Sequence, residues 1–167
     1  MTVLTHLIDT STLTDLFARD VSTLIQIEHH DPRALAISAI SDFELQAALI
    51  NPSKRLDNDR ALYAFLSQHW RVLPFDSIVA PVAASYRDYI KLSGKIVGHY
   101  QLLIGATAKA HNLTLVTRTP DEYQFLPDLT VIDWQTDVSS WFPEKKAARS
   151  AVKSAAKQPL HDEVTPA

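Results

Sequence analysis

The chain has no cysteine among its 167 residues, which excludes disulfide frameworks, thiolate zinc sites and cysteine nucleophiles. It also has no excess of positive charge, because 16 basic residues face 19 acidic ones and the formal net charge is -3. Any nucleic acid must therefore be bound by a local site rather than by a general positive field. No apolar run reaches the roughly 18 residues of a membrane span, and no basic region precedes the first apolar residues. We expect a soluble, unexported, cytoplasmic protein without a membrane partner.

Hydrophobic residues make up 46% of the chain, enough to fill the core of one ordinary domain. Short apolar, β-branched runs alternate with longer segments of helical periodicity. The predicted strands are residues 3–8, 34–38, 71–75, 113–117 and 130–134. The predicted helices are residues 9–19, 42–50, 57–69, 78–92 and 101–110, the fourth with a tolerable break at Pro81. This alternation predicts an α/β fold whose central, mostly parallel sheet is flanked by helices.

The composition changes after Trp134, and few large apolar residues follow Phe142. Residues 145–157 can form a basic, Ala/Lys-rich helix, but one with almost no apolar face to bury. We therefore predict a folded domain over residues 1–134 and a basic C-terminal tail over residues 135–167, disordered from about Gln158.

Two acidic residues occupy positions that suggest chemistry. Ligands of an open parallel sheet bind at the carboxyl ends of its strands, and Asp9 directly follows the first predicted strand. A helix N-cap is an equally good explanation of Asp9 taken alone. Glu44 shares a helix face with Ile40, Ala47 and Ala48, so it is predicted to be half-buried, where a carboxylate needs a cation, a donor or a function. A surface glutamate is the alternative.

Gln101 is a polar residue on an apolar helix face. It shares that face with Ile104, Gly105 and Ala108, at spacings of three, four and seven residues. Packing alone would favour an apolar side chain there. We therefore expect the glutamine to have a role other than packing.

These residues carry a resemblance. The segments HLIDTSTLTDLF, ISAISDFEL, PFD and QLLIGATAKAHNLTLVTRTPDEYQFLPDLTVIDW, which span residues 5–134, resemble the PIN-domain family and are most similar to its VapC-type ribonuclease toxins. Asp9 matches the family's first acid after strand one, and Glu44 matches its glutamate in the ISAI-x-x-x-EL pattern. The resemblance implies a PIN-like fold and hydrolysis of RNA by Mg²⁺, or Mn²⁺, held in a cluster of three or four carboxylates.

Gln101 stands where the family usually has an aspartate. Its amide oxygen can still ligate or orient a metal-bound water, but it brings no negative charge. The interaction energy between a unit charge and a divalent ion about 4 Å away is on the order of a few kcal/mol at an intermediate dielectric. Both metal affinity and rate are therefore expected to fall.

The fourth acidic position of the family has two candidates. Glu122 aligns best, and Asp121 is an alternative metal ligand if the loop shifts by one residue, although a simple turn at Pro120 and Asp121 explains the segment equally well. We expect support around the acids from the side chains of Ser11, Thr119 and His99, the last of these suited to manganese more than to magnesium.

The resemblance also implies partners. RNA phosphates are expected to contact Arg118, Lys54 and Arg55, with nonspecific attraction from the basic tail. A homodimer and a cognate antitoxin protein are expected near an apolar helical surface that is otherwise core, formed by Leu45, Leu49, Leu62 and Phe65. His29 and His30 are predicted to lie in a solvated loop.

Gln101 leaves two other interpretations open. The fold has lost catalysis and serves as an RNA-binding or protein-binding module, or the glutamine was introduced in the laboratory to tame a toxic nuclease. Metal-dependent cleavage separates an enzyme from a binding module, and recovery of activity in Gln101→Asp bears on the third interpretation.

Overall fold

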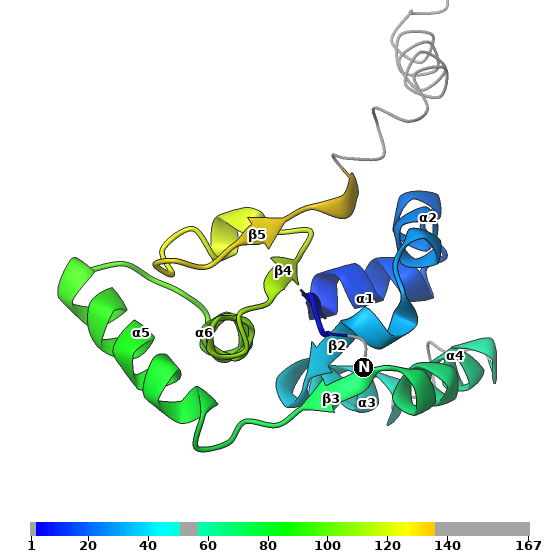
Figure 1. The fold of residues 1–167 in the computed structure, drawn as a ribbon, viewed down its shortest axis with the longest axis horizontal. Helices are drawn as coiled ribbons and strands as arrows, with labels where there is room; N and C mark the ends of the chain where they lie inside the picture. Colours follow the sequence, from blue (N-terminus) through cyan, green and yellow to red (C-terminus); the bar gives the residue numbers. More distant parts are fainter. Residues whose placement is uncertain (1–2, 51–56, 136–167) are drawn as a thin grey trace, which may run out of the picture.

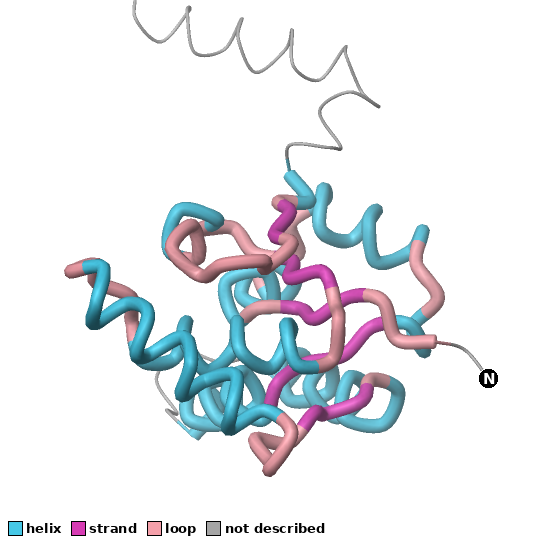
Figure 2. The backbone as a smooth tube through the Cα atoms, turned by 60° about the vertical axis from the view of Figure 1, so that its left-hand side comes forward, coloured by secondary structure: helices cyan, strands magenta, loops and turns pink. Residues whose placement is uncertain are grey.

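The structure is a computed structural model that describes residues 3–50 and 57–135. Its centre is a parallel sheet of five strands in the order β3-β2-β1-β4-β5. The strands are β1 (His6–Ile8), β2 (Leu35–Ser38), β3 (Arg71–Leu73), β4 (Thr114–Val116) and β5 (Val131–Ile132). They lie in the middle of the molecule with helices on both sides (Figures 1 and 2). The predicted α/β class with a parallel sheet is confirmed.

The helices are α1 (Thr10–Phe17), α2 (Val21–His29), α3 (Ala39–Ile50), α4 (Asp57–His69), α5 (Val79–Ser93) and α6 (His99–Ala110). Two short 3₁₀ turns, η1 (Pro32–Ala34) and η2 (Pro120–Glu122), precede β2 and follow β4. Pro81 does not interrupt α5, because it lies in the first turn, where the backbone N–H groups have no partner within the helix. Every observed strand is shorter than its predicted range, because only the paired residues extend the sheet.

Sequence periodicity missed α2. The helix is rich in β-branched residues, which lower helix propensity, but Asp20 caps it by accepting a hydrogen bond from the Thr23 backbone N–H at 3.0 Å. The prediction of a solvated loop at His29 and His30 is therefore wrong. His29 ends the helix, and the half-buried His30 ring stacks on Trp134 with ring centroids 5.1 Å apart.

Strict alternation along the strands separates two hydrophobic cores. Leu7, Ala36 and Leu115 are register partners that pack with α5 and α6 on one face of the sheet. The next residues along the same strands belong to the second core, with α1, α3 and α4 on the opposite face, and they are Ile8, Ile37 and Val116. Because side chains of a strand alternate between faces, this register leaves the three central strands, β2, β1 and β4, buried on both sides.

The strand order places one junction at the centre of the sheet. The chain runs from β1 outward through β2 to β3, then returns to the other side of β1 to form β4 and β5. The carboxyl ends of β1 and β4 are therefore neighbours at the point where the strand order reverses, which is where open α/β sheets bind ligands. Both Figure 1 and Figure 2 place α5 on the outside of the molecule, and it packs on α6.

Candidate functional site

Asp9 lies at this junction, directly after β1. Its side chain is buried, and Oδ1 accepts a hydrogen bond from the Thr10 backbone N–H at 2.7 Å. Oδ2 accepts hydrogen bonds from Ser11 Oγ at 2.8 Å and from Thr117 Oγ1 at 2.7 Å. Asp9 is also the N-cap of α1. The cap and its surrounding donors hold the buried negative charge in one fixed orientation.

Thr117 joins Asp9 to the strand beside it. It follows β4 directly, is fully buried, and its hydroxyl lies 3.0 Å from Ser11 Oγ while it accepts a hydrogen bond from the Thr119 backbone N–H at 3.2 Å. Sequence reasoning missed it, because a β-branched residue at the end of an apolar run is read as a strand former. The one sequence feature that could have found it is its place at the carboxyl end of a predicted strand, where an open parallel sheet binds ligands.

Glu44 reaches the same place from α3. Its half-buried carboxylate accepts a hydrogen bond at 2.5 Å from the hydroxyl of Thr10, the residue whose backbone N–H binds Asp9. A single residue therefore bridges the two carboxylates that sequence order had paired. Thr10 itself was not predicted as part of the site.

Tyr123 adds a buried hydroxyl that sequence analysis did not identify. Its side chain is 1% exposed, and among the described residues its hydroxyl has no hydrogen-bond partner. Burial, followed by the negative charge of Asp9, raises the pKa of Tyr123 far above its usual value of 10. The Asp9 carboxylate raises that pKa both through its charge and as a hydrogen-bond acceptor, although no contact of the hydroxyl within the described residues meets the distance and angle of an ordinary hydrogen bond. The hydroxyl is therefore a protonated and unused donor.

Gln101 lies in the first turn of α6 and is half-buried. Its amide folds back onto Gly98, where Oε1 lies 2.0 Å from the position that a Cβ on residue 98 would take. Gly98 therefore leaves the space that the amide fills. Within the described part of the chain, no hydrogen bond joins Gln101 to Asp9 or Glu44.

The other predicted acids lie at exposed positions. Asp121 and Glu122 are exposed in η2, whose following residue, Tyr123, takes the inward position. His99 begins α6 and is exposed. No group of three or more histidine, aspartate or glutamate side chains suited to a metal occurs over residues 3–50 and 57–135. The structure thus joins two of the expected carboxylates, Asp9 and Glu44, through Thr10, and a third or fourth carboxylate at this junction stays a prediction.

Arg118 is held by ion pairs rather than left open. Its guanidinium lies 2.6 Å from Asp15 and 3.0 Å from Asp133, and its backbone N–H donates to Ser11 Oγ at 3.0 Å. These contacts connect the end of β4 to α1 and to the residue after β5. Contact with a phosphate remains a prediction and competes with both ion pairs. Lys54 and Arg55 lie outside the described residues.

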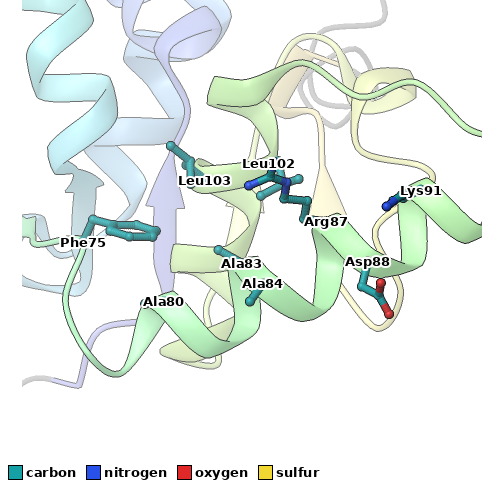
Figure 3. Close-up of a pocket in the computed structure, with 9 residues that line it drawn as sticks. All are labelled: Phe75, Ala80, Ala83, Ala84, Arg87, Asp88, Lys91, Leu102 and Leu103. Atoms are coloured by element: carbon teal, nitrogen blue, oxygen red, sulfur yellow. The ribbon is translucent and has the colours of Figure 1, made fainter.

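A separate pocket lies between α5 and α6 (Figure 3). It encloses about 540 Å³ and is lined by Phe75, Ala80, Ala83, Ala84, Arg87, Asp88, Lys91, Leu102 and Leu103. Among the described residues, no hydrogen bond or ion pair joins this lining to Asp9 or Glu44, and neither carboxylate lines the pocket. No helix in the described ranges is both long and apolar enough to cross a membrane.

Comparison with known proteins defines the class. A family model described as the PIN domain matches residues 6–124. The chain is 32% identical over 100 residues to Ribonuclease VapC2 of Rickettsia felis, an alignment that covers 60% of this chain and 74% of that protein. It is 36% identical over 106 residues to Toxin FitB of Neisseria gonorrhoeae, covering 58% and 73% of the two chains.

Solved structures share the fold. The DNA-bound VapBC structure from Salmonella typhimurium superposes with a TM-score of 0.71 at 22% identity and covers 79% of this chain and 99% of that one. VapBC2 of Rickettsia felis gives 0.70 at 23% identity, with 78% and 99% covered. The chain belongs to the PIN-domain family.

Proposed function

We propose that the chain is a metal-dependent endoribonuclease and the toxin of a type II toxin-antitoxin pair. Two relatives, named a ribonuclease and a toxin, support this assignment. The observation that carries it is the pair of carboxylates, Asp9 and Glu44, joined through Thr10 at the carboxyl edge of the sheet. The cytoplasm, predicted from the cysteine-free sequence, is the compartment in which such an enzyme would meet cellular RNA.

The donor chemistry of this pair fits Mg²⁺ or Mn²⁺. Both side chains offer hard oxygen ligands, and magnesium is commonly held by one or two carboxylates, with waters and substrate phosphates completing its shell. Asp9 and Glu44 would hold the ion, and the amide oxygen of Gln101 is a neutral third candidate. When bound, the ion supplies charge neutralisation at the phosphate and activation of a water.

The residues of the chain provide orientation. Ser11 and Thr117 fix Oδ2 of Asp9, and Thr10 fixes the distance between Asp9 and Glu44. This arrangement keeps two negative charges together without a change of conformation when the substrate arrives, which is the requirement for preorganised catalysis. We further propose that Glu122, or Asp121 in its place, completes the site from η2, with support from Thr119 and His99.

The proposed partners are RNA, an antitoxin and a second copy of the chain. Several of the structural relatives are toxin-antitoxin complexes. On α3 and α4 the side chains of Phe43, Ile50 and Phe65 are 54%, 79% and 51% exposed, more apolar surface than solvent contact alone favours. We propose this surface as a protein interface, and Lys54, Arg55 and Arg118 as phosphate contacts.

Cleavage of a mixed pool of structured RNA tests the function. The chain is expected to cut RNA in Mg²⁺ or Mn²⁺ and to lose the activity in EDTA. Asp9→Asn should lose at least about two orders of magnitude in rate, since it removes a charge at the proposed centre while keeping its shape. Cleavage that persists in EDTA, or in Asp9→Asn, would contradict the assignment.

A binding module is the second candidate. The neutral Gln101 favours it, as does the lack of a three-carboxylate group within residues 3–50 and 57–135. In that case the wild-type chain binds RNA or protein and cleaves no RNA at any metal concentration, whereas it retains the fold.

A further inference from the structure

Tyr123 is a buried donor that the proposed reaction does not yet use. Its ring packs on α6, where Cδ1 lies 3.5 Å from the position that a Cβ on Gly105 would take. Its hydroxyl is buried without a partner among the described residues, next to the charges of Asp9 and Glu44. An unpaired buried hydroxyl destabilises a fold. We therefore expect this one to have a specific role.

Tyr86 shows how the same fold treats a tyrosine with a purely structural role. It is similarly buried, at 4% exposed, but its hydroxyl donates to the backbone carbonyl of Pro127 at 3.0 Å. The fold thus gives Tyr86 an internal hydrogen bond of ordinary geometry, whereas within the described residues the Tyr123 hydroxyl has the Asp9 carboxylate close by but no such bond to it. We therefore expect a ligand at the site to supply the better-placed acceptor for Tyr123.

The chemistry of the site indicates which class of ligand supplies this acceptor. The Asp9 oxygens already accept hydrogen bonds from Thr10, Ser11 and Thr117. A water on a divalent cation directs a lone pair to the ion, so it is a good donor and a poor acceptor. A phosphodiester instead brings anionic oxygens, which accept strong hydrogen bonds.

We propose that Tyr123 is a substrate-binding residue, whose hydroxyl donates a hydrogen bond to a non-bridging oxygen of the phosphodiester held beside Asp9 and Glu44. The inference rests on the proposed phosphodiester-cleaving function. A neutral donor at this position would attract the substrate anion to a site whose own carboxylates repel it, and it would do so without competing for the cation.

Tyr123→Phe tests the inference in the full chain, because it removes only the hydroxyl. Thermal unfolding without ligand, binding of Mn²⁺ alone, and binding of a 2′-O-methyl hexaribonucleotide with Mn²⁺ are measured, with the oligonucleotide checked for integrity by gel. We expect an unchanged or higher melting temperature, unchanged Mn²⁺ binding, and oligonucleotide binding weakened about tenfold.

Tyr86→Phe is the matched control. It deletes a buried tyrosine hydroxyl that has an internal acceptor, so it should lower the melting temperature and leave oligonucleotide binding unchanged. The inference is overturned if Tyr123→Phe binds the oligonucleotide like the wild type, or if neither chain binds it. It is also overturned if Tyr123→Phe destabilises the free chain as much as Tyr86→Phe, or weakens binding of Mn²⁺ alone.

Failure of the proposed function gives a different result. It is seen as an absence of metal-dependent RNA cleavage by the wild-type chain, whereas the binding measurement needs no turnover. If the wild type cleaves RNA and Tyr123→Phe binds the oligonucleotide normally, the proposed role of Tyr123 is wrong, whereas the proposed nuclease function stands.

Discussion

Thr117 carries much of the local order around Asp9. Its hydroxyl donates to Asp9 Oδ2 and accepts from the Thr119 backbone N–H, so one side chain connects the catalytic candidate to the strand and the loop beside it. Since it is fully buried, water cannot replace these contacts when the hydroxyl is removed.

Thr117→Val is predicted to cost about 1–3 kcal/mol in the free energy of unfolding, because it leaves a buried carboxylate short of a donor. It should also reduce the stabilisation of the chain by Mn²⁺. Both effects are measured by chemical denaturation with and without the ion.

Thr12→Val is the control, since its hydroxyl donates to the Val116 carbonyl at 3.2 Å and that carbonyl also accepts from the Asp9 backbone N–H. A smaller loss, about 1 kcal/mol or less, and an unchanged Mn²⁺ effect are expected there. Equal behaviour of the two variants would argue against a special role for Thr117.

Individual site residues were predictable from sequence to different degrees. Asp9 and Glu44 were identified because they are charged residues at positions that order and spacing make unusual, and the fold brings them together through Thr10. Thr117 and Tyr123 were missed because their residue types are ordinary in a strand and a core. Only the tertiary structure shows that the Thr117 hydroxyl donates to Asp9 and that the Tyr123 hydroxyl has no well-formed hydrogen bond within the described residues.

At the level of elements, the site depends on how closely α6 approaches the segment that follows η2. Gly105 allows this approach, because a Cβ there would lie 2.4 Å from Leu126 Cδ1 and 3.2 Å from Leu129 Cδ2. The same close approach places the Tyr123 ring against α6, with Cδ1 3.5 Å from that Cβ position.

Gly105→Ala is therefore predicted to destabilise the fold. Overpacking costs about 1–3 kcal/mol, which outweighs the gain of about 1 kcal/mol that alanine has over glycine within a helix. A net loss of about 1 kcal/mol should lower the melting temperature by a few degrees in thermal unfolding.

Gly98→Ala provides the comparison. Its Cβ would meet the end of the Gln101 side chain, which is half-buried and can rotate away, so a change within about 0.5 kcal/mol is expected. If Gly98→Ala were the more damaging variant, the packing explanation for Gly105 would be wrong.

Element types were predicted better than element ends. The apolar periodicity correctly located α4 at residues 57–69, but it missed α2, whose β-branched residues favour strands and whose stability comes from a cap and from packing. Strand ends depend on which residues find a hydrogen-bond partner, and that information lies in other parts of the chain.

At the scale of the whole molecule, ring contacts connect β1, the end of α2 and the residues after β5. His6 lies edge-on to His30 at a centroid distance of 4.9 Å, and His30 stacks on Trp134. Burial, then the nearby His30, lowers the pKa of His6 below its usual value of 6.5. The folded state therefore binds a proton at His6 less readily than the unfolded chain does.

Stability should consequently fall as the pH is lowered. The contribution of neutral His6 is fully present above about pH 6.5 and is lost as the pH falls through the lower pKa of the folded state. His6→Gln is expected to show a smaller drop in melting temperature between about pH 7.5 and about pH 5. Equal drops in both chains would contradict the role of His6.

The topology explains why residues far apart in sequence form one site. Residues 9 and 117 meet because β1 and β4 are neighbours at the reversal of strand order, and residue 44 joins them from α3, which follows β2 on the other side of β1. Residue 123 follows β4 through η2. Sequence alone predicted a parallel sheet and a site at its carboxyl edge. It did not predict how many acids would reach that edge, since Asp121 and Glu122 stay on the surface.

RNA cleavage as a function of Mn²⁺ concentration, in the wild type and in Gln101→Asp, tests the central claim that the site around Asp9 and Glu44 is a metal-dependent nuclease even without a carboxylate at position 101. The account predicts that both chains cleave and that Gln101→Asp reaches its maximum at about tenfold or more lower Mn²⁺, because it adds a charge near the ion. A silent wild type at every concentration, with activity only in Gln101→Asp, would contradict the claim and show an intact scaffold whose catalytic site is disabled by Gln101.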